Sequence, residues 1–131
     1  NSICEKFWPG LLTINIAPAR GLVWDLGDER TLEEIAVRVP AADFIRDVAL
    51  ASGPLAIGSA TLAGRPPTQK SRFFPCLDSD YAAIFDAGDL PEGPNSTVIS
   101  VKDDGVMLRR QGAISLADLR SVTPNIAVPA S

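Results

Sequence analysis

Glycine and proline interrupt this chain at short intervals. Ten Gly and eleven Pro are spread over the 131 residues rather than gathered in one tract. Both residue types end helices and strands, so the pattern restricts the chain to short elements joined by tight turns. Hydrophobic residues make up 46% of the sequence, which is enough for a hydrophobic core in a chain of this length. We expect one domain over residues 1–131.

Short runs in which apolar residues alternate with polar or small ones predict strands. The run LLTINIA follows a Pro9-Gly10 turn, and IAVRV stops at Pro40. The segments TVISV and VMLRR, joined by Lys102-Asp103-Asp104-Gly105, predict a hairpin with an Asp-Gly turn. Two further runs, LAIGSA and YAAIFD, are typical of buried strands. The predicted strands are therefore 11–17, 35–39, 55–60, 81–86, 97–101 and 106–110.

Two segments predict helices. Residues 42–51 place Phe44, Ile45, Val48 and Ala49 at helical spacing, with Arg46 facing outward, before a Ser-Gly-Pro stop. Ser115 has the side chain of an N-cap for a helix over 116–122. Strands interleaved with helices indicate an α/β or α+β sheet protein.

Composition excludes several classes of site. The chain has no histidine, so it contains no Ser-His-Asp triad and no His-ligated metal. Its two cysteines, Cys4 and Cys76, are too few for a disulfide scaffold, and we expect reduced thiols. The net charge of −4 argues against a protein that coats nucleic acid without sequence preference. No secretory signal or membrane-spanning run is visible, so we expect a cytoplasmic protein without a membrane segment.

Four positions carry side chains suited to ligand binding, and each also has a purely structural interpretation. Arg38 lies mid-strand between valines: it either reaches solvent or clamps a carboxylate or phosphate with its guanidinium fork. Ser59 follows Gly58 at the end of a predicted strand, either in a simple turn or facing a ligand. Ser96 opens another strand, either as a lone turn serine or with its hydroxyl and backbone N–H presented to an anion. Arg110, beside Arg109, lies at a strand end, and alternation places these two guanidiniums on opposite faces.

The order and spacing of several short motifs carry more information than any one of them. Along the chain follow Phe-Trp-Pro-Gly at 7–10, Ala-Val-Arg-Val-Pro at 36–40, Gly-Pro-Leu-Ala at 53–56, Ser-Thr-Val at 96–98, and Arg110 with Gly112. This succession resembles the YrdC/Sua5 family of L-threonylcarbamoyladenylate synthases from Phe7 to about Leu119. The resemblance implies a YrdC/RibB-like fold, a twisted open mixed α/β sheet with flanking helices and a concave, positively charged cleft.

The resemblance also implies a reaction. In that family, L-threonine and bicarbonate form N-carboxythreonine, which attacks the α-phosphate of ATP and expels pyrophosphate. The product serves the t6A modification of tRNA at position 37 through a separate threonylcarbamoyl-transfer machinery. Mg²⁺ on the phosphates and well-placed cations are what such chemistry needs.

Matched residue by residue, the resemblance assigns Arg38 and Ser96 to the threonine site, and Ser59 and Arg110 to the ATP site. It assigns no catalytic side chain and no metal ligand to this chain. Glu34 stands where the family commonly has a small hydroxyl residue, and a carboxylate there would repel phosphates.

The lysine/arginine motif of the family lies upstream of anything that resembles Phe7. We therefore expect the domain to be N-terminally incomplete, and an enzyme if that basic motif exists. The alternatives are a divergent, non-catalytic module that binds a nucleotide or RNA, and a domain that acts through protein contacts alone.

Overall fold

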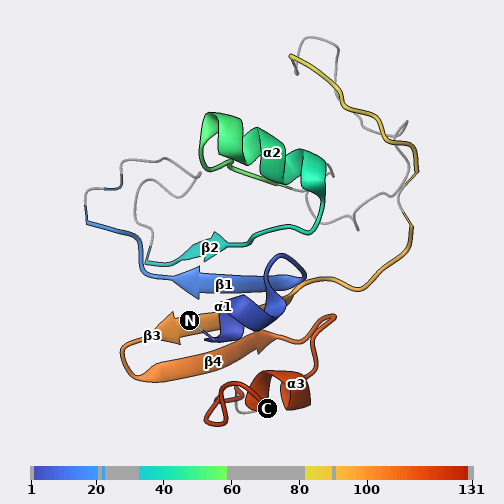
Figure 1. Ribbon diagram of the computed structural model, residues 1–131. Coiled ribbons are helices and arrows are strands. Elements are labelled where there is room, and N and C mark those ends of the chain that lie inside the picture. The colour runs from blue at the N-terminus through green and yellow to red at the C-terminus, as the bar shows by residue number, and fades with distance from the viewer. Residues whose placement is uncertain (1, 21, 23–32, 59–81, 90, 130–131) are drawn as a thin grey trace. The chain divides into compact units, whose positions relative to one another are not determined.

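The structure, a computed structural model, describes residues 2–20, 22, 33–58, 82–89 and 91–129 (Figure 1). The chain divides into two compact units. The first comprises residues 1–55 and 94–131, and the second comprises residues 56–93. All regular elements of the described residues belong to the first unit: α1 Ser2–Phe7, β1 Leu12–Ile16, β2 Ile35–Val37, α2 Asp43–Ser52, β3 Thr97–Lys102, β4 Gly105–Arg110 and α3 Leu116–Arg120.

The four strands form one mixed sheet in the order β2-β1-β3-β4. Strands β1 and β3 are parallel and begin side by side, since Leu12 pairs with Thr97. The outer strands β2 and β4 run antiparallel to their neighbours. Consequently the inner strands begin, and the outer strands end, at the same edge of the sheet. The predicted mixed α/β sheet with flanking helices is confirmed.

Alternation separates the sheet into an apolar and a polar face. The apolar face forms a core of fully or nearly buried side chains, against which residues of α1 and α3 pack. The core residues are Leu12, Ile14, Ile99, Leu108, Leu119 and Ile126. The polar face carries the alternate positions, among them Thr13, Asn15 and Ser100.

Most predicted elements are present with slightly different bounds. The hairpin turns at Asp103-Asp104, where Gly105 adopts a φ of +135°. Ser115 caps α3 by accepting from the Asp118 backbone N–H. The sequence did not predict α1, whose six residues are too few for a periodic signal, although Ile3 and Phe7 pack against the core.

The strands predicted at 55–60 and 81–86 are wrong for the residues that the structure describes. Residues 55–58 and 82–86 form no strand there, and Ile57 and Ile84 are 73% and 64% exposed. A run of apolar residues becomes a strand only where a neighbouring strand accepts its hydrogen bonds, and no such pairing reaches these residues within the described part of the chain. The remaining positions of these two predictions, 59–60 and 81, lie outside the described residues.

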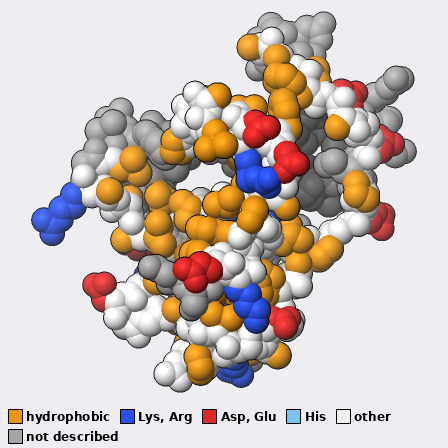
Figure 2. Space-filling view, in the orientation of Figure 1, with side chains coloured by type: hydrophobic (Ala, Val, Ile, Leu, Met, Phe, Trp, Pro, Cys, Tyr) orange, Lys and Arg blue, Asp and Glu red, His pale blue; other side chains and the backbone are white. Residues whose placement is uncertain are grey.

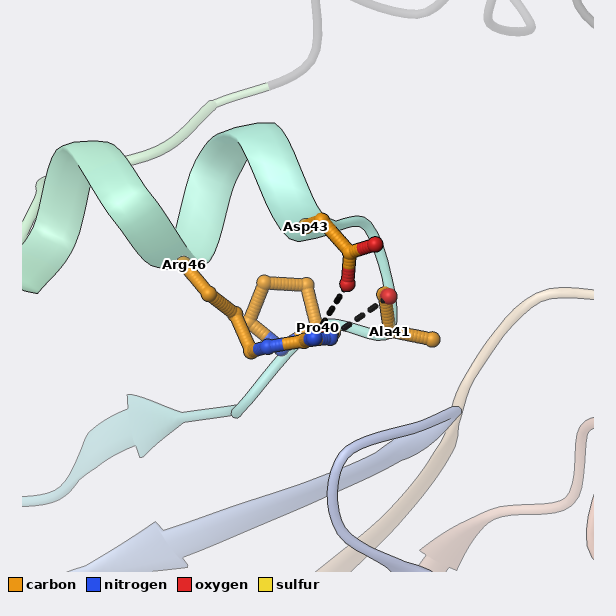
Figure 3. A network of polar contacts seen from close by, with 4 residues as sticks. All are labelled: Pro40, Ala41, Asp43 and Arg46. Carbon is orange, nitrogen blue, oxygen red and sulfur yellow. Dashed lines mark hydrogen bonds and ion pairs between the residues drawn. The ribbon is translucent and has the colours of Figure 1, made fainter.

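The corner between β2 and α2 is held by Arg46 (Figure 3). Its Nη1 donates to the carbonyl oxygens of Pro40 and Ala41 at 3.2 and 2.6 Å, and its Nη2 forms an ion pair with Asp43. The side chain, predicted to face outward, folds back over the first turn of its own helix and is 32% exposed. Its three contacts fix the backbone that immediately follows Arg38.

No helix among the described residues is both long and apolar enough to cross a membrane. On the face drawn in Figure 2, Lys and Arg side chains lie in separate places among hydrophobic and acidic ones.

Candidate functional site

The edge where β1 and β3 begin brings three of the four predicted site residues together. Arg38 directly follows β2, Ser96 directly precedes β3, and Arg110 ends β4. Thr97 N donates to the Leu11 carbonyl oxygen at 2.9 Å, which joins the starts of the two inner strands. The fourth predicted residue, Ser59, lies outside the described residues.

Arg110 and Ser96 are in direct contact. The Nε and Nη2 of Arg110 donate to the Ser96 carbonyl oxygen at 3.3 and 3.0 Å, and Nη2 also donates to Ser96 Oγ at 3.2 Å. Ser96 Oγ accepts a further hydrogen bond from Thr13 Oγ1 at 2.9 Å. The Ser96 hydroxyl therefore accepts from both sides, and its own proton is left to donate to another group.

A β-bulge explains how Arg110 comes to face Ser96. Ile99 pairs with Leu108, but the next pair joins Val98 to Arg110, so Arg109 is the extra residue on β4. Arg110 thus lies opposite Val98, which shares its face with Thr13. The simple alternation that assigned Arg109 and Arg110 to opposite faces does not hold across the bulge.

Arg38, which follows β2, is held by the turn that precedes β1. Its Nε donates to the Gly10 carbonyl oxygen at 2.7 Å, and Gly10 N donates to the Val39 carbonyl oxygen at 2.8 Å. The side chain is exposed, and within the described residues its two terminal amino groups have no hydrogen-bond partner. Those amino groups form the half of the guanidinium fork that suits a carboxylate or phosphate.

A second polar cluster lies farther along the same face. The Glu34 carboxylate accepts from Ser100 Oγ at 3.1 Å and from Asn15 Nδ2 at 3.4 Å, and it pairs with Lys102 Nζ at 2.9 Å. The hydrogen bond from Lys102 is the main reason why the pKa of Glu34 is lowered from its ordinary value of 4.5. The hydrogen bond to Glu34 in turn raises the pKa of Lys102 above 10.5.

This cluster changes the interpretation of Glu34. As an isolated carboxylate on the polar face, it would repel phosphates. With the ammonium group of Lys102 at 2.9 Å, the pair has no net charge. The alternating sequence of β1 and β3 indicated that Asn15 and Ser100 share a face, but no sequence signal linked them to Glu34, which is 66 residues from Ser100.

Two other features complete the description of the site. A pocket of about 240 Å³ lies at the opposite, hairpin end, lined by residues that include Lys102, Met107 and Arg109, and by neither Arg38 nor Ser96. Among the described residues, no three His, Cys, Asp or Glu side chains gather as metal ligands. The edge of Arg38, Ser96 and Arg110 presents guanidinium and hydroxyl groups, which suit the orientation and neutralisation of an anionic ligand.

Three further residues at this edge were given no site role from the sequence. Thr13 contacts Ser96, Thr97 binds the segment after β4, and Gly112 lies against the backbone of Asn95 and Ser96. Thr97 and Gly112 belong to the motifs at 96–98 and 110–112, whereas Thr13 is 83 residues from Ser96 and no sequence signal linked the two.

Comparisons with known proteins agree with the resemblance drawn from the motifs. A family model named Sua5_yciO_yrdC and described as "Telomere recombination" matches residues 1–112. The threonylcarbamoyl-AMP synthase of Bacillus subtilis is 35% identical over 97% of this chain, and that of Pyrococcus abyssi is 29% identical over 96%. This chain spans 37% of the length of each of these curated relatives.

Solved structures show the same fold. A crystal structure of P. abyssi Sua5 complexed with L-threonine has a TM-score of 0.79 and 26% sequence identity. It is matched over 97% of this chain and 37% of its own. A second structure of P. abyssi Sua5 gives the same TM-score. With 112 of its 131 residues matched by the family model, this chain belongs to the Sua5/YciO/YrdC family.

Proposed function

We propose that this chain is part of an L-threonylcarbamoyladenylate synthase, and that the edge formed by Arg38, Ser96 and Arg110 binds its substrates. The observation that carries the proposal is the convergence of two guanidinium groups from outer strands on the starts of the two inner strands. Relatives named threonylcarbamoyl-AMP synthase, and the P. abyssi Sua5 complexed with L-threonine, support it.

In the proposed reaction, the amino group of L-threonine takes up bicarbonate with loss of water and becomes a carbamate. A carbamate oxygen then attacks the α-phosphorus of ATP, the bond to the β-phosphate oxygen breaks, and pyrophosphate leaves. The products are L-threonylcarbamoyl-AMP, pyrophosphate and water. Mg²⁺ belongs to the nucleotide substrate in this scheme, carried on its phosphates.

Each residue of the edge has a role that matches its chemistry. Arg38 binds the threonine carboxylate with its two terminal amino groups, and Ser96 donates its proton to the same substrate. Arg110, fixed by Ser96, presents positive charge to the nucleotide. From the family resemblance alone, Ser59, which lies outside the described residues, is assigned to the nucleotide as well. Such positioning and charge neutralisation account for most of the catalysis in phosphoryl and nucleotidyl transfer, which requires no histidine.

The biological context follows from the product. Threonylcarbamoyl-AMP is an activated carbamoyl donor, and we propose that a separate transfer machinery places the group on tRNA to form t6A at position 37. We also propose a cytoplasmic location.

Release of pyrophosphate tests the proposal. The complete protein is mixed with ATP, Mg²⁺ and bicarbonate, with and without L-threonine. We expect pyrophosphate only when threonine is present, together with a product that contains both AMP and threonine. Binding of ATP without threonine-dependent release would instead support the non-catalytic nucleotide-binding alternative.

A further inference from the structure

Thr97 is the first residue of β3, and its side chain is completely buried although it carries a hydroxyl group. A buried hydroxyl stabilises a fold only when its hydrogen bonds are made, since an unpaired one loses its contacts with water without compensation. The contacts of this hydroxyl therefore indicate what it does.

The hydroxyl of Thr97 makes three hydrogen bonds, all to one short segment. Oγ1 accepts from the backbone N–H of Gly112 at 3.0 Å and from that of Ile114 at 2.9 Å. It donates to the Ile114 carbonyl oxygen at 2.8 Å. One donor and two acceptor positions are the full capacity of a threonine hydroxyl, so it is saturated.

The segment 112–114 begins two residues after Arg110, and the residue before Thr97 is Ser96. The two strand ends are joined by further contacts: Ala113 N donates to the Asn95 carbonyl oxygen at 2.9 Å, and Arg110 donates to that of Ser96 at 3.0 Å. A buried hydroxyl thus ties the backbone after Arg110 to the backbone after Ser96.

We infer that Thr97 is a positioning residue of the substrate site: its hydroxyl fixes Ser96 and Arg110 relative to each other without touching substrate. This inference rests on the proposed function of that edge. Valine has the shape of threonine without the hydroxyl, so Thr97→Val fills the same space but leaves the Gly112 and Ile114 amides without their acceptor. Thr97→Ser keeps the hydroxyl and removes only a methyl group.

Amide hydrogen exchange, which requires no ligand, tests whether the Thr97 hydroxyl holds the segment 112–114 in place. In the complete protein, the Gly112 and Ile114 amides should be protected in the wild type and in Thr97→Ser. In Thr97→Val they should exchange about tenfold faster or more, while amides of β1 keep their protection. Unchanged protection at both amides in Thr97→Val would overturn the inference.

Threonine affinity tests the positioning role. We expect Thr97→Val to weaken L-threonine binding about tenfold or more, because small displacements of binding groups are costly. Thr97→Ser should stay within about twofold of the wild type, and so should the matched control Thr123→Val, which removes a hydroxyl beyond α3. In turnover, the effect should appear mainly in the KM for threonine.

Failure of the proposed function and failure of the positioning role of Thr97 give different results. A wild-type protein that does not bind threonine contradicts the proposed function. Amide exchange still tests whether the Thr97 hydroxyl joins the start of β3 to the segment after β4. If Thr97→Val does not fold, Thr97→Ser decides: a folded Thr97→Ser protein that loses both amide protection and affinity overturns the inference, because its hydroxyl is retained.

Discussion

Arg110 donates three hydrogen bonds to Ser96, two to its carbonyl oxygen and one to its hydroxyl oxygen. The two residues lie 14 positions apart in the sequence, and the family resemblance assigns them to different substrates, Ser96 to threonine and Arg110 to ATP. Their direct contact places the two proposed subsites next to each other. That adjacency is required for attack of a threonine-derived carbamate on the α-phosphate of a nucleotide.

The first prediction concerns Arg38. Replacing it by alanine removes the two terminal amino groups proposed to bind the threonine carboxylate. We expect Arg38→Ala to bind threonine about 10- to 100-fold more weakly, since a hydrogen-bonded charge contributes about 1.5–3 kcal/mol. Pyrophosphate release should require about 10- to 100-fold more threonine than in the wild type.

Because the Arg38 side chain is exposed, the variant should unfold at the same urea concentration as the wild type within error. Arg20→Ala, at another exposed arginine, provides the control for loss of one positive charge. Normal threonine-dependent turnover in Arg38→Ala would refute the role assigned to Arg38.

The second prediction separates Arg110 from its neighbour Arg109. The bulge places Arg110 opposite Val98 and in contact with Ser96, whereas the only hydrogen bond of Arg109 among the described residues is a weak one to Met107 Sδ at 3.7 Å. We expect Arg110→Ala to weaken ATP binding about tenfold, and Arg109→Ala to leave it within about twofold. Calorimetric titration with Mg²⁺ and ATP measures both. Equal losses in the two variants would mean that general positive charge, rather than the bulge geometry, determines binding.

The third prediction concerns pH and the Glu34–Lys102 pair. The folded protein lowers the pKa of Glu34 below 4.5, so the pair stabilises the fold above that pH and loses its contribution as the pH falls through the lowered pKa. It raises the pKa of Lys102 above 10.5, so the contribution is also lost as the pH rises through that raised value.

Urea unfolding of the wild type and of Glu34→Gln across pH tests this expectation. The wild type should be the more stable protein at neutral pH, and the difference should shrink well below pH 4.5. Glu33→Gln, at an exposed carboxylate next in sequence, is the control for the loss of one negative charge. A difference that stays constant from neutral to strongly acidic pH would contradict the pairing.

The sequence predicted the helices and strands whose own residues carry a clear pattern, such as alternation, a turn motif or an N-cap. Strand β1 alternates strictly, β3 and β4 flank an Asp-Gly turn, and Ser115 is a strong N-cap, so all were placed within a few residues. The motifs also indicated Arg38, Ser96 and Arg110, which the fold brings to one edge.

What the sequence did not predict depends on contacts between distant residues. The bulge at Arg109 arises from the pairing of β4 with β3, and no property of Arg109 itself predicts it. The ion pair of Glu34 with Lys102 joins residues 68 positions apart across the sheet. The apolar runs at 55–58 and 82–86 satisfied the local rule for strands, but local rules do not supply a pairing neighbour.

The fourth prediction concerns Gly112, whose place beside Ser96 admits no side chain. A Cβ atom there would lie 2.6 Å from the Ser96 carbonyl oxygen and also overlap the Asn95 carbonyl oxygen, both of them backbone atoms. Gly112→Ala must therefore separate the segment 112–114 from the start of β3. We expect a loss of about 1–3 kcal/mol in the free energy of unfolding, measured with urea, and weaker threonine binding. Gly93→Ala is the matched control, because a methyl group there meets no atom within 4 Å. Gly112→Ala could instead be as stable as Gly93→Ala and bind threonine normally. In that case the close approach of the segment 112–114 to the start of β3 would not be what fixes Ser96 relative to Arg110.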